Sequence, residues 1–360
     1  MELLKVIGKR FVNGILVMFG VVLIVFLLFN ILPVNSARMT LGQRADMASV
    51  AAIEKEFRLN LPAGQRLLLY LNDLSPISFH KQDNPDAPSY LNPDEVKFAS
   101  LFTVGSTTVV AKWPYLGKSF QYRKKVSDIL GEKIFPTFLL AIIAMAIASL
   151  LGIVLGVFAA IKQYSVWDNV ILTLSTLGIS QPAFFAGIIL AIIFGFYLGE
   201  YTHLGVTGSL IDLDPYTGEP MIIWKNLILP VAALSVRPIA IITQLTRASM
   251  LDSLSQDYIR TARAKGLGYY TVIFKHALRN AMNPVVTSIS GWLAALLTGA
   301  FFIESVFHYD GLGLTTISSI LSFDFPVVMG SVLLVALVFV VMNMLTDILY
   351  SVLDPRVTVK

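Results

Sequence analysis

The stretch Gln256–Val286, QDYIRTARAKGLGYYTVIFKHALRNAMNPVV, is basic, amphipathic and rich in helix-forming residues. It lies between two apolar runs that are each long enough to cross a membrane. Tyr258–Ala264 and Thr271–Arg279 are predicted to form two short helical pieces on either side of Gly266 and Gly268, because glycine accommodates turns that other residues resist. A compact cationic hairpin between two spans predicts contact with a soluble partner on the cytoplasmic side.

The hairpin is expected to have one apolar face and one solvent-exposed face. Val272, Ile273, Phe274 and Leu278 are predicted to pack back on the membrane helices. The basic side chains are expected to stay in water: Arg260, Arg263, Lys265 and Lys275. A loop whose charge only sets membrane topology would carry the same residues, so that alternative stays open at this stage.

The composition is that of a membrane protein. Of 360 residues, 56% are hydrophobic and only 14% are charged, whereas a soluble domain is about 25% charged. The formal net charge of +4 sits beside apolar spans, where it orients the chain, so no nucleic-acid partner is predicted. Cysteine is absent from the sequence, which excludes disulfides and Cys-based metal or redox sites.

Six spans are predicted from apolar runs of about 20 residues or more. They are Phe11–Leu32, Ile134–Ile161, Val170–Leu198, Ile222–Thr246, Pro284–Ile303 and Phe325–Tyr350. The first run has no small-residue cleavage site after it, so it is interpreted as an uncleaved span. Gly152 and Gly156 share a face of the second span and are expected to let another helix approach closely.

The short loops give the predicted orientation. The outer loops 199–221 and 304–324 contain acidic residues and no lysine or arginine, whereas the segments assigned inside are basic. This positive-inside asymmetry predicts that both termini are cytoplasmic. The long segment 34–133 then lies outside, and loops of that length are exempt from the charge rule.

Four regions are predicted. They are a tail and first span (1–33), an extracytoplasmic segment (34–133), a five-span core (134–350) that includes the cytoplasmic hairpin 247–283, and a cytoplasmic C-terminal tail (351–360). Within the outer segment, Ala48–Tyr70 is predicted to be helical with a break at Pro62. Residues 75–98 are interpreted as loop, and Leu101–Ala111 as one or two short strands.

No catalytic constellation is recognisable. Gly117-Lys118-Ser119 resembles the end of a phosphate-binding loop, but Lys112 stands where the motif needs its first glycine. The four histidines are scattered without metal-ligand spacing. Any energy input is therefore expected from another chain.

Three residues inside or beside the spans are singled out. Arg237 lies ten residues before Arg247, about 15 Å into the fourth span, where a charge is expensive and suggests function. It is a candidate for the substrate pathway, with pairing to a carboxylate of a partner permease as the alternative. Pro182 is a candidate kink that lines the pathway, with a plain kink needed for helix packing as the alternative. Glu304 is expected to be a solvated outer carboxylate, with contact to a delivering binding protein as the other interpretation.

The order of motifs resembles a known family. Arg260–Asn280 is similar to the "EAA" loop of ABC transporter permeases, in the form used by peptide permeases (the dipeptide/oligopeptide B-type subunit). Six further stretches match in order. They are TLGISQPAFFAG ending at Gly187, LILPVAAL (227–234), LTRASMLDSL (245–254), ESVFHYDGLG (304–313), and DFPVVMGSVLL with DILYSVLDPR (324–334 and 347–356). Residues 76–114 are longer than is usual for the family.

The resemblance implies an all-α permease of the type I importer class, with six transmembrane helices and an extra outer segment between spans one and two. It implies a coupling helix, about Ala262–Tyr270, that docks on a cytoplasmic ATPase; Gly266→Pro is expected to uncouple ATP hydrolysis from transport. The implied coupling residues are Arg260, Ala262, Arg263, Ala264, Lys265, Gly266, Leu267 and Gly268.

The implied function is ATP-driven import of di- and oligopeptides across the inner membrane. The partners are a second (C-type) permease, ATPase subunits that bind ATP and Mg²⁺, and an extracytoplasmic binding protein; this chain is expected to be no enzyme and to bind no cofactor. Import of nickel or another small solute is an alternative, because related permeases share these motifs. A self-contained channel or secondary transporter is another, which the basic hairpin and the lack of an evident inverted repeat disfavour.

Overall fold

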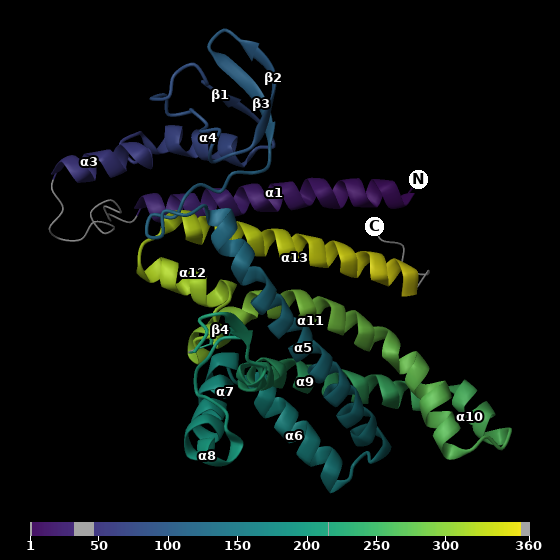
Figure 1. Cartoon of the computed structure of the whole chain (residues 1–360). Coiled ribbons are helices and arrows are strands. Elements are labelled where there is room, and N and C mark those ends of the chain that lie inside the picture. The colour runs from purple at the N-terminus through teal and green to yellow at the C-terminus, as the bar shows by residue number, and fades with distance from the viewer. Residues whose placement is uncertain (1, 32–46, 215, 354–360) are drawn as a thin grey trace. The chain divides into compact units, whose positions relative to one another are not determined.

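The computed structural model describes residues 2–31, 47–214 and 216–353 (Figure 1). The end of the C-terminal tail, residues 354–360, lies outside the described residues. The chain divides into two compact units. One comprises Met1–Ile15, Lys133–Thr315 and Val335–Lys360, and the other comprises Leu16–Glu132 and Thr316–Leu334.

Four helices are long and apolar enough to cross a membrane. They are α1 (Glu2–Ile31), α5 (Val126–Ile161), α9 (Lys225–Leu254) and α13 (Phe325–Leu353). Two further segments qualify only if a bent pair counts as one span, so the described chain has four to six candidate spans. The spans predicted from residues 11, 134 and 325 onward are therefore confirmed as helices, and the one predicted from residue 222 is helical from Lys225.

The predicted third span, Val170–Leu198, is not one straight helix. It consists of α6 (Val166–Ser180) followed by α7 (Ala183–Leu190) and the π-helical turn η1 (Ala191–Tyr197), bent by 108° at the break. Gln181 has φ −97° and ψ 147°, the extended conformation that a following proline imposes. The Pro182 ring then opens α7, since proline suits the start of a helix and not its interior.

The predicted fifth span is also bent. It begins with the π-helical turn η2 (Thr271–Ala277), continues into α11 (Leu278–Phe307), and bends by 50° between Leu297 and Ala300. The short α12 (Leu312–Leu321) follows in a segment that was predicted to be loop.

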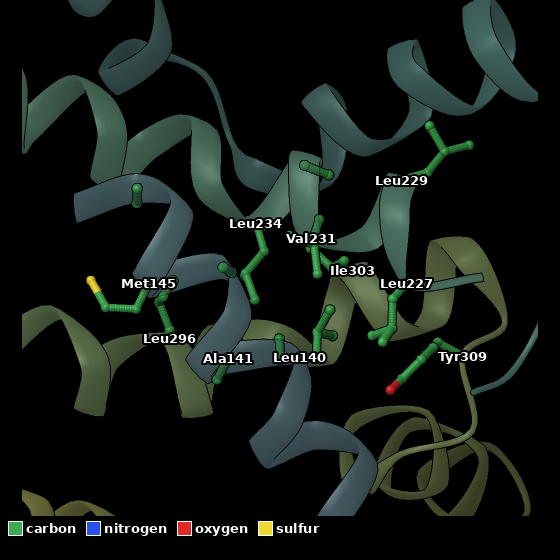
Figure 2. Close-up of a cluster of buried hydrophobic side chains, with 14 of the residues drawn as sticks. Leu140, Ala141, Met145, Leu227, Leu229, Val231, Leu234, Leu296, Ile303 and Tyr309 are labelled. Carbon is green, nitrogen blue, oxygen red and sulfur yellow. The ribbon is translucent and has the colours of Figure 1, made fainter. Parts of the chain in front are cut away.

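The core of the larger unit lies between α5, α9 and α11. Figure 2 shows Leu140 of α5, Leu234 of α9 and Ile303 of α11 gathered around a common apolar centre, with the ring of Tyr309 beside them. The close approach that was predicted for Gly152 and Gly156 is observed. A Cβ at Gly156 would lie 2.6 Å from the carbonyl oxygen of Thr243 on α9, so only glycine allows the two helices to meet there.

The smaller unit contains a three-stranded antiparallel sheet, so the chain is mostly helical and not purely α. The strands β1 (Ile77–His80), β2 (Phe98–Val104) and β3 (Thr107–Lys112) are ordered β1-β3-β2. The strands predicted at 101–111 are confirmed, whereas β1 falls in a stretch predicted to be loop. The buried face of this four-residue strand is polar (Ser78 and His80) and its apolar residues Ile77 and Phe79 are exposed, so apolar patterning does not reveal it.

Two helices precede the sheet, α3 (Met47–Glu56) and α4 (Ala63–Leu74). The predicted break at Pro62 is confirmed, because Pro62 caps the start of α4. The side chain of Asn72 holds α4 against β1 through two hydrogen bonds to the backbone of Phe79, at 2.8 and 2.9 Å. Elsewhere, α8 (Gly199–Thr202) and the small hairpin of β4 (Ile211–Leu213) and β5 (Pro220–Ile222) lie in the predicted outer loop 199–221.

Candidate functional site: the basic hairpin

The basic hairpin consists of α10 (Asp257–Ala264), a turn, and η2 leading into α11. The two predicted helical pieces are therefore confirmed. The continuous coupling helix expected at Ala262–Tyr270 is wrong, because α10 ends at Ala264 and Gly266 adopts a left-handed φ of +74°. That conformation strains any residue with a Cβ, so the chain reverses there instead of continuing as a helix.

The inner face of the hairpin is apolar and packed. Ile259 and Ala262 of α10 and Val272 and Ile273 of η2 are buried against residues of α5 and α9, with Val157 and Met250 among them. The predicted burial of Val272 and Ile273 is confirmed. This packing holds the hairpin on the helix bundle as one body.

The outer face combines cations with exposed rings. Tyr269, Tyr270 and Phe274 are 59%, 76% and 52% exposed, and Leu267 at the turn is 40% exposed. The prediction that Phe274 packs on the bundle is wrong; it follows two buried residues, and the helical rotation carries its side chain to the outer side. The four basic side chains predicted to stay in water are all exposed: Arg260, Arg263, Lys265 and Lys275.

The charges of this outer face are largely uncompensated. Arg260 is 3.5 Å from Asp257, and both side chains are at least 80% exposed. Among the described residues, Arg263, Lys265 and Lys275 have no ion pair. Of the eight candidate coupling residues, Ala262 alone is buried, and the other seven lie on the accessible side.

An ion pair that sequence reasoning missed lies near the hairpin. Arg247 donates to both carboxylate oxygens of Asp168, at 2.6 and 2.7 Å, and the Asp168 side chain is 1% exposed. The backbone N–H of Tyr164 also donates to Asp168 at 3.0 Å. The pair ties the first turn of α6 to α9 with bidentate geometry, and its only sequence signal is an acidic residue three positions after the N-cap Ser165.

Arg237 lies on α9 with its side chain exposed and has no acidic partner in the described chain. Its guanidinium carbon is 5.7 Å from the ring centre of Trp292 on α11, within cation–π range. Pro182 is exposed at the break between α6 and α7. Arg237 and Pro182 therefore lie on α9 and at the start of α7, apart in sequence from the hairpin residues 257–277.

Glu304 is wholly buried, and the expectation of a solvated carboxylate is wrong. The Thr137 hydroxyl donates to it at 2.6 Å, and the backbone N–H groups of Gly313 and Leu314 donate at 2.7 and 3.2 Å. The carboxylate thus caps the free N–H groups at the start of α12. A contact between α5, α11 and α12 cannot be seen in the local sequence of Glu304.

No group of three histidine or acidic residues able to hold a metal ion is found within the described ranges.

The chain matches a family of membrane proteins over most of its length. Residues 152–359 match the model of the "binding-protein-dependent transport system inner membrane component", and residues 3–92 match the model of its N-terminal region. The chain therefore belongs to this family of multi-pass inner-membrane permeases.

Curated relatives cover almost the whole chain. A putative peptide transport system permease protein of Brucella abortus (strain 2308) is 34% identical over 350 residues, which is 97% of both chains. The di/tripeptide transport system permease protein DppB of Pseudomonas aeruginosa (strain UCBPP-PA14) is 33% identical over 99% of both chains. The dipeptide transport system permease protein DppB of Alkalihalophilus pseudofirmus is 31% identical over 97% of this chain and 98% of its own.

These findings confirm the family predicted from the hairpin and the ordered motifs, and they confirm the class of ABC transporter permease. A binding-protein-dependent system of this class includes an ATPase and a binding protein as partners of the membrane component.

Proposed function

We propose that this chain and a second, C-type permease form the path by which di- and oligopeptides cross the inner membrane. An extracytoplasmic binding protein delivers the peptide, and cytoplasmic ATPase subunits, which bind ATP and Mg²⁺, drive the transport. The peptide substrate is supported by the curated relatives, three of which carry peptide, di/tripeptide or dipeptide transport in their names.

The hairpin is the observation that carries the proposal. Its apolar inner face is fixed on the bundle, while its outer face presents exposed aromatic rings beside unpaired cations. Exposed aromatic side chains suit the centre of a protein interface, and the surrounding cations suit an acidic rim. We infer that this face docks on the ATPase and that the packed inner face passes rigid-body motion into α5, α9 and α11.

The proposed topology follows the charge asymmetry of the loops. Both termini and the hairpin 247–283 are cytoplasmic, and segment 34–133 is extracytoplasmic. The two bent pairs each count as one span, which gives six spans of a type I importer permease with a five-span core at 134–350.

Arg237 and Pro182 are proposed to line the peptide pathway. The absence of an acidic partner for Arg237 within the described chain, together with the exposure of its side chain, supports contact with a peptide carboxylate or carbonyl. Pairing with the second permease is the competing role.

A matched pair of tyrosine variants tests the docking face. Tyr270, in the hairpin, is 76% exposed and Tyr201, in the predicted outer loop, is 83% exposed, so aspartate at either position should leave the fold intact. Tyr270→Asp should reduce at least tenfold the ATPase that co-purifies with the tagged chain, and should abolish peptide-stimulated ATP hydrolysis in proteoliposomes. Tyr201→Asp should retain both. Equal ATPase retention and activity in the two variants would rule out docking through this face.

A further inference from the structure

The unit that contains the β-sheet holds a large cavity with no assigned role. Its volume is about 710 Å³, within the range of small-molecule sites. All of its lining residues belong to Leu16–Glu132 and Thr316–Leu334, so the cavity is formed within one unit. Aromatic rings form much of the wall; Phe57 and Phe120 meet edge to face at 4.4 Å, and Phe29 and Phe325 lie 4.3 Å apart.

Two buried oxygen atoms in the wall have no hydrogen-bond partner among the described residues. Asp73 is 7% exposed, and one of its carboxylate oxygens has no hydrogen bond from the described residues. The Tyr70 hydroxyl is buried and likewise unpartnered in the described chain. The two residues are three positions apart on α4, so their side chains lie on one helix face. A buried polar atom without a partner is costly and calls for a ligand or an ordered water.

Other charges of the wall are already engaged. The second carboxylate oxygen of Asp73 accepts from Arg58 at 2.7 Å. Lys118 pairs with Glu95 at 2.6 Å, and Glu56 accepts from Arg123 at 2.7 Å. The described lining holds four acidic residues (Glu54, Glu56, Asp73, Glu95) and three basic ones (Arg58, Arg66, Lys118). Because Arg123 outside the lining neutralises Glu56, these charges balance, and the unpartnered oxygens decide the kind of ligand.

The unpartnered atoms select the kind of ligand. A carboxylate oxygen is an acceptor only, and a phenolic oxygen can also accept. Burial and the nearby Asp73 carboxylate raise the pKa of Tyr70, so its hydroxyl stays neutral. A primary ammonium group carries several N–H donors and could satisfy both oxygens at once. The aromatic wall suits an apolar body attached to that ammonium.

We propose that this cavity binds the free amino end of a short peptide, with the ammonium group donating to Asp73 Oδ1 and to the Tyr70 hydroxyl. The ligand class rests on the proposed peptide transport function. Its wall combines the outer segment with Phe26 and Phe29 near the end of α1 and with Phe325 and Met329 at the start of α13, so it is a peptide subsite formed by the outer segment and the adjoining helix ends.

Binding is measured by titration calorimetry on the full chain in lipid nanodiscs, without binding protein, ATPase or ATP. The probes are alanyl-phenylalanine and its N-acetylated form. The variants are Tyr70→Phe and Asp73→Asn, and the matched controls are Tyr122→Phe and Asp86→Asn, which lie in the same unit but outside the cavity wall. Tyr70→Phe removes only an unpartnered oxygen, so it keeps the test valid even where Asp73→Asn weakens folding.

The wild-type chain should bind the free dipeptide roughly tenfold or more tightly than the acetylated one, as expected for a charge-assisted hydrogen bond. Both cavity variants should lose that preference, and both controls should keep it. Equal affinity for the two probes, or an unchanged preference in Tyr70→Phe, would assign the buried oxygens to ordered water and overturn the proposal. Peptide uptake by the complete transporter is measured separately. Uptake without this binding would rule out the subsite and leave the proposed transport function standing.

Discussion

Glu304 is the residue whose environment differs most from what its sequence neighbourhood suggests. A carboxylate in an acidic loop is usually solvated, yet this one is enclosed and accepts three hydrogen bonds from Thr137, Gly313 and Leu314. Its partners come from 167 positions before it and from nine and ten positions after it. Only the folded arrangement reveals such a cap, so sequence reasoning had no means to predict it.

Replacing this carboxylate should loosen the start of α12. Glu304→Gln replaces the carboxylate by a neutral amide with one acceptor oxygen, which weakens the charge-assisted hydrogen bonds from the Gly313 and Leu314 N–H groups, and the expected loss of local stability is about 1–3 kcal/mol. Hydrogen exchange at the Gly313 and Leu314 amides should speed up accordingly. Glu200→Gln, which alters an exposed carboxylate on α8, serves as the control and should leave these amides unchanged. Unaltered exchange in Glu304→Gln would show that the cap contributes nothing.

His80 makes the β-sheet sensitive to acid. Its ring is fully buried, with Nδ1 2.8 Å from the Ser89 carbonyl oxygen and Nε2 2.9 Å from the Ser78 hydroxyl. Nδ1 therefore donates to the carbonyl oxygen, and the Ser78 hydroxyl can donate to Nε2 when the imidazole is neutral. Burial lowers the pKa of His80 below its ordinary value of 6.5. The unfolded chain then binds the proton more readily than the folded one.

The lowered pKa of His80 determines how the stability of the sheet changes with pH. Stability of the sheet should be constant above about pH 7.5 and should fall as the pH drops below about 6.5, by at most about 1.4 kcal/mol per pH unit. Hydrogen exchange of the β1 and β3 amides, corrected for intrinsic rates, measures it. His80→Asn should remove this pH dependence. A sheet equally protected at pH 5.5 and 7.5 in the wild type would contradict the assignment.

At the scale of elements, two prolines interrupt helices, and sequence reasoning predicted the break at Pro62 but only a candidate kink at Pro182. Pro62 was predicted to break a helix and does so, because proline lacks the N–H that a helix interior needs and here precedes the first residue of α4. Pro182 stands in a long apolar run, and the run was interpreted as a single span. The bend of 108° shows that the backbone restriction around Gln181-Pro182 prevails over apolar continuity. Hydropathy reports how apolar a segment is, and it carries no information on whether the backbone bends within that segment.

The turn of the hairpin offers a test with an internal control. Gly266 has a φ of +74°, whereas Gly268 has no such left-handed φ, and neither has an atom within 4 Å of an added Cβ. Gly266→Ala should cost about 1–2 kcal/mol of local stability, and Gly268→Ala should cost far less. The two substitutions add the same methyl group, so a difference between them isolates backbone conformation.

The readout is the ratio of peptide uptake to ATP hydrolysis in proteoliposomes of the complete transporter. Gly266→Ala should lower that ratio and Gly268→Ala should leave it near the wild-type value. Equal ratios in both variants would indicate that the geometry of the turn does not matter for coupling.

At the scale of the whole molecule, the class of protein was predictable because it depends on composition, the order of apolar runs and short motifs. The sheet of the smaller unit was only partly predictable. Strands β2 and β3 carry β-branched residues, but β1 has four residues and is recognised only through its pairing with β3. Contacts between distant segments, such as the pair Asp168–Arg247, likewise depend on the tertiary fold.

The orientation can be tested with single cysteines, because the natural chain has none. Trp113, in the segment proposed to be outside, is 87% exposed, and Tyr270 of the hairpin is 76% exposed. A membrane-impermeant maleimide should label Trp113→Cys in intact cells and Tyr270→Cys only in inverted vesicles. The reverse pattern would invert the proposed topology, and labelling of both positions from one side would place the hairpin and the sheet on the same side.

The bend between α6 and α7 bears on how the chain enters the membrane during synthesis. Helix α6 has 15 residues, which at a rise of 1.5 Å gives about 22 Å, short of the roughly 30 Å of hydrocarbon. The second half of the pair, Ala183–Tyr197, is no longer. Neither half is an efficient stop-transfer sequence on its own, and both pack on α9, which is synthesised later. We therefore expect this segment to complete its insertion only after α9 has left the ribosome. Until then, the segment should depend on membrane insertases and chaperones.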